Sequence, residues 1–376
     1  FRDLISDQKK MADIQDLSLD DLLPRGRFTK DTLKLMSDKR IFISGAGGSI
    51  GSEIARQILD SNPQSIILFD ISEYNLFQLE RECLAKKASA NLSTEIIPIL
   101  GDIKDSKNLS FVFKKYQVDD VFHAAAYKHV PLVEDVNNII KASENNVLGT
   151  LNLANISIEQ KVNSFVMIST DKAVRPSNIM GASKRMSEMI IQSLNDQQSH
   201  TQFSMVRFGN VINSSGSVIP TFLDQISNGG PVTVTHKEVT RYFMTIPEAS
   251  NLVLQAAQMS NGGEVFILDM GEQLKIYDLA KKLIHLSGRS IASQPGGDGI
   301  EIEEVGLRPG EKMYEELLIS GDLKETENPK IFKSTESFPS SAIMTEVIKE
   351  IRQAIEDNNT DAIISIFKSY IEGYSS

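Results

Sequence analysis

The chain contains one cysteine, Cys83, and five histidines among its 376 residues. A single cysteine excludes an internal disulfide and a cysteine-based metal cluster, and such sparse use is typical of a reducing cytoplasm. Cys83 lies in a polar helical run, residues 79–84, so we expect an ordinary packed or half-exposed thiol rather than a nucleophile. No metal is predicted, because the histidines show no metal-ligand spacing: they are His123, His129, His200, His236 and His285.

Basic residues are outnumbered, with 39 Lys and Arg against 50 Asp and Glu and a net charge of −11. This balance argues against a general nucleic-acid-binding protein. A phosphate-bearing ligand would need a local basic site, built from a few Arg or Lys side chains and helix N-termini.

Long apolar runs are absent as well. No stretch approaches the ~18 uninterrupted apolar residues of a membrane-spanning helix, and the N-terminus shows no signal-peptide pattern. The chain begins at Phe1 rather than at Met, and we expect it to be a fragment of a longer protein. Its composition, 41% hydrophobic and 24% charged residues, is that of an ordinary globular protein.

Short apolar segments alternate with helical ones from Arg40 onward, behind a charged N-terminal arm over residues 1–38. The strand-like segments are residues 41–44, 65–70, 95–100, 118–124, 164–169 and 203–208. Such alternation is typical of right-handed βαβ units. It predicts an α/β fold with a parallel sheet covered by helices on both faces.

The sequence changes character after about residue 210, where Gly, Ser and Pro become frequent and short strands mix with helices at residues 246–258 and 276–286. We expect a Rossmann-type doubly wound sheet over residues 39–209. A smaller ligand-binding lobe is expected over residues 210–335, with strands that can return to the first sheet. A C-terminal helical segment, residues 336–376, completes the chain.

A glycine-rich turn follows the first strand. Gly45, Gly48 and Gly51 have the spacing G-x-x-G-x-x-G rather than the strict G-x-G-x-x-G, and a helix begins at once with Ser49 and Ile50. Glycines permit a tight turn and close approach of the backbone to a pyrophosphate, whose charge the helix N-terminus favours. The turn alone is weak evidence for a dinucleotide site, because a plain strand-to-helix connection looks similar.

Acidic residues at the ends of the next two strands strengthen the dinucleotide hypothesis. Asp70 ends the second strand about 20 residues after the glycines, where an acid accepts hydrogen bonds from the ribose diol of adenosine. An acid there repels a 2′-phosphate, so NAD is favoured over NADP. Asp102 and Ile103 follow the third strand, near the expected adenine, although an ordinary turn residue is the alternative for Asp102.

Several later motifs point to a family. Residues 122–131 follow the fourth strand and read FHAAAYKHVP, and residues 169–172 follow the fifth strand and read STDK. NNVLGT, VRFGNV, TRYFMT and RPGEK then occur in order at residues 145–150, 206–211, 240–245 and 308–312. In these motifs the chain resembles the extended short-chain dehydrogenase/reductase superfamily. More narrowly, it resembles the bacterial UDP-N-acetylglucosamine 4,6-dehydratases, over roughly residues 14–335.

Position 180 departs from the superfamily. The Tyr-x-x-x-Lys pair would place a tyrosine there and a lysine at 184, but Met180 has no proton to give or take. An inactive, degenerate domain is one reading. The swap is also characteristic of one branch, the long, membrane-anchored dehydratases that retain the C5 configuration and feed polysaccharide and protein-glycosylation pathways. Residues 20–27 resemble the linker before their catalytic domain, which implies a soluble part at the cytoplasmic face.

The resemblance implies a reaction. Hydride passes from C4 of a UDP-linked amino sugar to NAD, water leaves across C5 and C6, and the hydride returns to C6. Asp171 is then the acid, Lys172 the base and Thr170 a partner of the C4 hydroxyl, while Lys184 holds the nicotinamide ribose. The acid and base each need the less usual protonation state, so we expect a desolvated, coupled pair. The acceptor of the C4 proton stays open between Asp171, Thr170 and a water.

The resemblance also implies binding residues. Further cofactor contacts are expected from Ala124, Ala125, Ala126 and Asn146. Substrate contacts are expected from Lys128, Asn210, Val218, Thr235, Arg241, Arg308 and Glu311. Of these, Arg241 and Arg308 are the diphosphate ligands, because the guanidinium fork matches phosphate oxygens.

Other functions stay open. A C5-inverting dehydratase or a nucleotide-sugar 4-epimerase would share the fold, but these enzymes resemble the pattern with tyrosine. A non-catalytic NAD-binding regulator would share it too, although the intact motifs at residues 170–172 and 308–311 speak against one. A homo-oligomer is allowed, and membrane contact is expected only through a segment that precedes residue 1.

Overall fold

The computed structural model describes residues 36–294, 297–318, 323–334 and 336–375. Two compact units divide them: the larger comprises residues 36–208, 247–269 and 316–375, and the smaller comprises residues 209–246 and 270–315. Apart from residues 36–38, the expected N-terminal arm lies outside the described residues.

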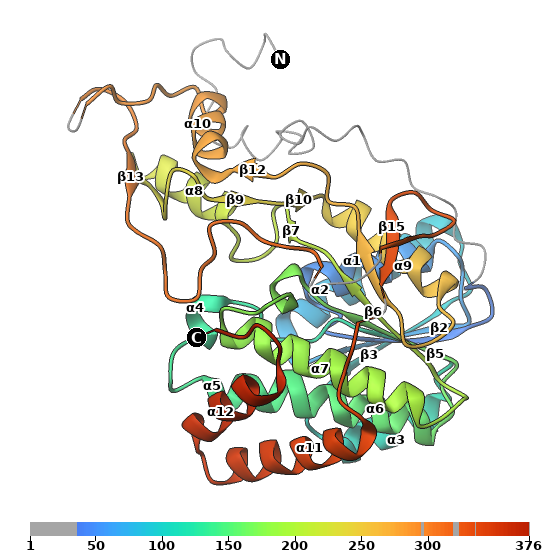
Figure 1. The fold of residues 1–376 in the computed structure, drawn as a ribbon. Helices are drawn as coiled ribbons and strands as arrows, with labels where there is room; N and C mark the ends of the chain where they lie inside the picture. The colour runs from blue at the N-terminus through green and yellow to red at the C-terminus, as the bar shows by residue number, and fades with distance from the viewer. Residues whose placement is uncertain (1–35, 295–296, 319–322, 335, 376) are drawn as a thin grey trace. The chain divides into compact units, whose positions relative to one another are not determined.

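A nine-stranded sheet runs through the larger unit in the order β14-β15-β11-β6-β5-β4-β1-β2-β3 (Figure 1). Its strands are β1 Arg40–Ser44, β2 Ser65–Asp70, β3 Glu95–Leu100, β4 Asp120–His123, β5 Ser164–Ile168, β6 Gln202–Arg207, β11 Val265–Leu268, β14 Lys324–Glu325 and β15 Ile331–Ser334. From β3 to β11 all neighbours are parallel, and β15 and β14 add antiparallel partners at one edge. The order β3-β2-β1-β4-β5-β6 is that of a dinucleotide-binding sheet, so the expected α/β, Rossmann-type fold is confirmed.

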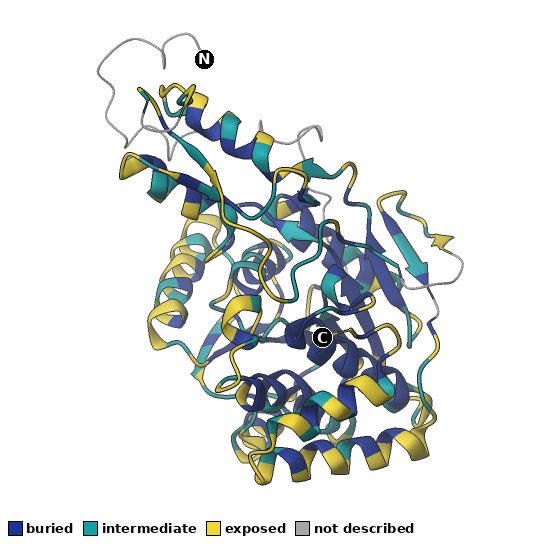
Figure 2. Ribbon diagram, turned by 60° about the vertical axis from the view of Figure 1, so that its left-hand side comes forward, coloured by how far each residue is buried: buried dark blue, intermediate teal, exposed yellow. Residues whose placement is uncertain are grey.

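Helices cover both faces of this sheet (Figure 1). The helices α1 Ser49–Leu59, α2 Glu73–Ala90 and α9 Ile246–Met259 lie on one face, and α3 Ser106–Tyr116, α6 Thr150–Glu159 and α7 Ile179–Asp196 lie on the other. The central strands are mostly apolar and buried, as Figure 2 shows, because a parallel sheet with two covered faces leaves no strand side for water. Two C-terminal helices, α11 Ser341–Glu356 and α12 Thr360–Tyr370, pack on α7 and contribute to one apolar cluster with it.

Residues 247–269 pack with the larger unit, although the sequence had placed them in the second lobe. The reason is β11, whose four apolar residues are buried and pair in register with β6, Val265 with Met205 and Phe266 with Val206. The strand β15 then pairs with β11 and brings residues 331–334 to the same sheet.

The smaller unit contains three two-stranded sheets and two helices. Its strand pairs are β7 Asn210–Val211 with β10 Phe243–Met244, β9 Thr240–Arg241 with β12 Leu274–Lys275, and β8 Val232–Val234 with β13 Ile302–Glu304. The helices α8 Val218–Ser227 and α10 Ile276–Leu286 bury their apolar faces in its core, around Phe222 and Leu283. Throughout the described part of the chain, every helix is too short or too polar to span a bilayer.

Candidate dinucleotide and catalytic site

The glycine turn joins β1 to α1 and can be built only with glycine at its key positions. Gly45 has a φ of +65°, and a Cβ there would lie 2.6 Å from the backbone nitrogen of Ala125. A Cβ at Gly51 would lie 2.1 Å from the carbonyl oxygen of Gly45. No side chain caps the N-terminus of α1 at Gly48, which leaves the positive end of the helix dipole facing the turn.

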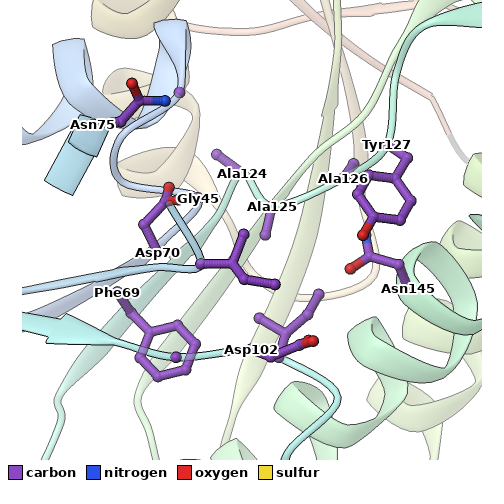
Figure 3. Close-up of a pocket in the computed structure, with 14 residues that line it drawn as sticks. Gly45, Phe69, Asp70, Asn75, Asp102, Ala124, Ala125, Ala126, Tyr127 and Asn145 are labelled. Carbon is purple, nitrogen blue, oxygen red and sulfur yellow. The ribbon is translucent and has the colours of Figure 1, made fainter. Parts of the chain in front are cut away.

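A pocket opens beside this turn at the carboxyl ends of β1 to β4 (Figure 3). Eight of the expected cofactor residues line it: Gly45, Gly48, Asp70, Asp102, Ile103, Ala124, Ala125 and Ala126. Others that line it were not expected: Phe69, Ile71, Asn75, Gly101, Tyr127 and Asn145. Most of these are sequence neighbours of expected residues, but nothing in the sequence marks Asn75, which α2 brings to the glycine turn.

Asp70 keeps acceptor positions of its carboxylate for further donors. Its side chain is buried, and its carboxylate accepts the N–H of Gly47 at Oδ2 and the N–H of Ser72 at Oδ1, both at 2.8 Å. A carboxylate has about four acceptor positions, so two remain for hydroxyl donors. Asp102 lines the same pocket while it also accepts the N–H of Lys104 at 2.9 Å, which makes it a turn residue as well.

Asn146 lies in a π-helical turn, Glu144–Gly149, just outside the pocket lining. Its Oδ1 accepts from the N–H of Tyr127 and from Nδ2 of Asn145, and its Nδ2 donates to the carbonyl of Tyr127 and to Oγ of Ser183. All four hydrogen-bonding positions of the amide are therefore used within the protein. Direct cofactor contact by this amide, which the sequence led us to expect, has no support here, and its neighbour Asn145 forms the pocket wall instead.

Lys184 presents a buried ammonium group on α7. The residue is 5% exposed and makes no hydrogen bond or ion pair with any described residue. Burial lowers the pKa of Lys184 to about 8, against which the charge of Glu188 acts. A buried ammonium without a hydrogen-bond partner is costly, which makes Lys184 a candidate for contact with a ligand. This fits the expected contact with a nicotinamide ribose.

The segment Thr170–Lys172 forms a hydrogen-bonded cluster after β5, in which Asp171 is buried while Thr170 and Lys172 are partly exposed. The Asp171 side chain is 1% exposed, and its Oδ1 accepts from Oγ1 of Thr170 at 2.8 Å and from Nζ of Lys172 at 3.0 Å. Its second oxygen, Oδ2, is buried and has no partner among the described residues. Thr170 and Lys172 thus donate to the same oxygen of Asp171, and the other oxygen is left for another donor.

The helix α7 approaches this cluster closely at Gly181. A Cβ at Gly181 would lie 2.1 Å from the carbonyl oxygen of Lys172, so only glycine lets the helix come so near. Met180 is 3% exposed and belongs to the apolar cluster around α7. Glu134, which the sequence did not single out, accepts the N–H of Ile179 at the start of the helix.

In the smaller unit, Glu311 contacts three of the residues expected to bind the substrate. Its Oε1 accepts from Oγ1 of Thr235 at 3.0 Å and from Nη2 of Arg241 at 2.8 Å, and its Oε2 accepts the N–H of Arg308 at 3.2 Å. Arg241 is buried and also donates to two backbone carbonyls, whereas the Arg308 side chain is exposed. Arg308 is therefore the more accessible guanidinium. Asn210 lies in β7 and Val218 starts α8, while Lys128 is exposed on a loop of the larger unit.

The sequence predicted an ordinary thiol at Cys83 and no metal site. Cys83 is buried in α2, and burial raises the pKa of its thiol to about 11, which confirms an ordinary packed side chain. Across the ranges that the structure describes, no group of three or more His, Cys, Asp and Glu side chains converges as metal ligands would.

Comparison with known proteins supplies the family. Residues 41–336 match the family described as polysaccharide biosynthesis protein. The chain belongs to this family. Within it, the chain is 49% identical over 326 residues to the capsular polysaccharide biosynthesis protein CapD of Staphylococcus aureus, covering 86% of this chain and 53% of CapD. It is 47% identical over 322 residues to the probable polysaccharide biosynthesis protein EpsC of Bacillus subtilis, covering 85% and 52%. This member of the family spans about half the length of those two relatives.

Solved structures show the same fold. The chain superposes on Pen from Bacillus thuringiensis with a TM-score of 0.69 at 34% identity, covering 81% of this chain and 89% of Pen. It superposes on DesIV, a dTDP-glucose 4,6-dehydratase from Streptomyces venezuelae, with a TM-score of 0.60 at 22% identity, covering 73% and 87%. The second likeness concerns the fold alone.

Proposed function

We propose that this polysaccharide biosynthesis protein is an NAD-dependent nucleotide-sugar dehydratase. Its substrate is UDP-N-acetylglucosamine, and its product is the UDP-linked 4-keto-6-deoxy sugar with the C5 configuration retained. The observation that carries the proposal is the ion pair of buried Asp171 with Lys172, held against a helix in which Met180 stands in place of tyrosine. The relation to CapD and EpsC supports a role in the synthesis of bacterial glycans.

The residues of the larger unit fit a dinucleotide. The glycine turn and the N-terminus of α1 would hold its pyrophosphate, Asp70 would accept from the adenosine ribose hydroxyls, and Lys184 would donate to the nicotinamide ribose. Bound NAD would supply a reversible hydride acceptor for C4 of the sugar. In the smaller unit, taken by itself, the exposed guanidinium of Arg308 is suited to a phosphate group.

Elimination then falls to the Asp171–Lys172 pair. Oxidation of C4 to a ketone acidifies the proton on C5, and Lys172 removes that proton when its amine is neutral. Asp171 protonates the C6 hydroxyl, which leaves as water. Lys172 afterwards returns its proton to C5 from the face on which it received it, so a single base accounts for retention at C5.

The proton of the C4 hydroxyl has a route through Thr170. Its hydroxyl donates to Oδ1 of Asp171, so it can accept the C4 proton while it passes its own proton to the carboxylate. Asp171 thereby gains the proton that it later gives to the C6 hydroxyl. This relay removes the need for a tyrosine at position 180 and leaves Asp171 ionised at the end of each cycle.

Two substitutions test these roles. Lys172→Met should abolish dehydration and the incorporation of solvent deuterium at C5, with the fold and dinucleotide binding retained. Asp171→Asn should likewise lose elimination, because an amide cannot protonate the departing hydroxyl. Lys107→Met, at an exposed position on α3, is the matched control and should behave as the parent. Product formation by Lys172→Met at near the parental rate would remove Lys172 from the role of base.

A second function, 4-epimerisation, is favoured by one relative. The chain is 33% identical over 297 residues to the UDP-glucose 4-epimerase of Rickettsia canadensis, covering 77% of this chain and 81% of that enzyme. An epimerase returns a 6-hydroxy sugar, whereas a dehydratase removes that hydroxyl, so the product separates the two functions. That the domain works at the cytoplasmic face as part of a longer, membrane-anchored protein stays a prediction.

A further inference from the structure

A buried charge network lies next to residues 169–172 of the larger unit, the catalytic segment. The guanidinium of Arg207, in β6, is fully buried and donates to two carboxylates at once. Its Nε and Nη2 contact Glu188 at 2.8 and 2.6 Å, and its Nη1 and Nη2 contact Glu336 at 2.6 and 2.7 Å. Arg185 bridges the same two carboxylates at 3.2 and 3.1 Å. The network holds two positive and two negative charges, which makes it neutral.

Glu188 is the member of this network that reaches the catalytic segment. Its Oε1 accepts from Oγ of Ser169 at 2.6 Å, and Ser169 directly precedes Thr170. The backbone of the same segment is tied to β6 on both sides of Arg207: the N–H of Ser169 donates to Val206 and the N–H of Asp171 donates to Phe208. Glu336, in contrast, has no contact with Ser169 among the described residues.

Stability alone does not explain such a network. A buried ion pair is often no more stabilising than apolar side chains of the same volume, because desolvation offsets the attraction between the charges. A carboxylate that is fixed by hydrogen bonds from guanidinium groups does, however, hold a further hydrogen-bond donor in a defined place. Here that donor is the hydroxyl of Ser169. Glu188 also lies one helical turn after Lys184 and counteracts the effect of burial on the pKa of that lysine.

We propose that Glu188 is a positioning residue for the catalytic segment: clamped by Arg207, it holds Ser169 and so fixes Thr170, Asp171 and Lys172 in their reactive geometry. This inference rests on the proposed dehydratase function for its kinetic consequence. The hold on residues 169–172 itself is a property of the ligand-free fold.

The decisive comparison is between Glu188→Gln and Glu336→Gln. Both variants remove one carboxylate charge from Arg207, so both should lower the melting temperature to a similar extent. Only Glu188→Gln weakens the hold on Ser169. Its kcat should fall by about 10- to 100-fold with the KM for the nucleotide sugar unchanged, as expected of misplaced catalytic groups. The kcat of Glu336→Gln should stay within about twofold of the parent.

Hydrogen exchange of the ligand-free protein gives a second readout that needs no turnover. The amides of residues 169–171 should exchange at least about tenfold faster in Glu188→Gln and at the parental rate in Glu336→Gln. Equal changes in the two variants, in exchange or in kcat, would overturn the positioning role and leave a purely structural network. If the parent does not dehydrate UDP-N-acetylglucosamine, the proposed function fails, while the exchange rates still decide whether Glu188 holds the segment.

Ser169→Ala covers the case in which neither glutamine variant folds. It removes only the hydroxyl that Glu188 holds and leaves all four charges in place. Faster exchange at residues 169–171 and a kcat reduced several-fold would support the proposal. A parental kcat together with parental exchange in this variant would overturn it.

Discussion

Replacing Lys184 by Met is expected to stabilise the ligand-free protein while it disables the enzyme. Burial lowers the pKa of Lys184 from its usual 10.5 to about 8 in the folded state. One pKa unit corresponds to about 1.4 kcal/mol, so keeping this ammonium charged in the fold costs about 3 kcal/mol of stability. Methionine has a similar length and no charge to desolvate. The substitution should therefore recover most of that free energy and lose the contact with the nicotinamide ribose.

The stability gained by Lys184→Met should decrease as the pH rises. Below pH 8 the lysine is protonated in both the folded and the unfolded chain, so the parent carries the full cost. Between pH 8 and 10.5 the unfolded chain binds more protons than the folded one, and the stability of the parent rises with pH. The advantage of Lys184→Met should thus be largest at neutral pH and shrink as the pH approaches 10.5.

Urea unfolding of both proteins, freed of dinucleotide, at pH 7 and pH 9.5 measures this difference. Lys107→Met, with an exposed lysine, is the control and should change stability little at either pH. A Lys184→Met variant that is less stable than the parent at pH 7 would contradict the cost of burying the ammonium group. So would a stability advantage that does not shrink by pH 9.5.

Three further predictions follow from the pocket and the core. NADP should bind at least about tenfold more weakly than NAD in a titration, because buried Asp70 faces the position of the 2′-phosphate; equal affinities would exclude that role. Met180→Leu should keep much of the activity in a product assay, since the volume is conserved and neither side chain carries a proton. Met180→Tyr should bring no gain, and a large gain would show that the parent lacks a needed base. Cys83 should resist iodoacetamide in the native protein and react after unfolding, because its thiol is buried and its pKa is raised; labelling of the native protein would contradict its burial.

Local patterns predict the sheet well because burial on both faces leaves a simple sequence signal. The strands Ser65–Asp70 and Glu95–Leu100 and the helix Ile276–Leu286 have the bounds that the sequence indicated. The two strands end at Asp70 and just before Gly101, which mark the carboxyl edge where the pocket forms. The same signal located Asp70 and Asp102, since both stand at strand ends.

Local sequence patterns could not predict contacts between residues that lie far apart in the chain. Arg207 and Glu336 are separated by 129 positions, and each taken alone resembles a solvated charge. Asn146 was expected to contact the cofactor because its motif resembles a family pattern, but a π-helical turn directs its amide to Tyr127 and Ser183 instead. Only the folded backbone determines which of two adjacent asparagines faces the pocket.

The proposed dehydratase function is tested most directly by identifying the product formed from UDP-N-acetylglucosamine. The purified protein is incubated with this substrate and NAD in D2O, and the nucleotide sugar is analysed by NMR. We expect a 4-keto-6-deoxy sugar that carries deuterium at C5 and keeps the C5 configuration of the substrate. A C5-inverted ketone, a 4-epimer that keeps its 6-hydroxyl, or unchanged substrate in the presence of bound NAD would contradict it.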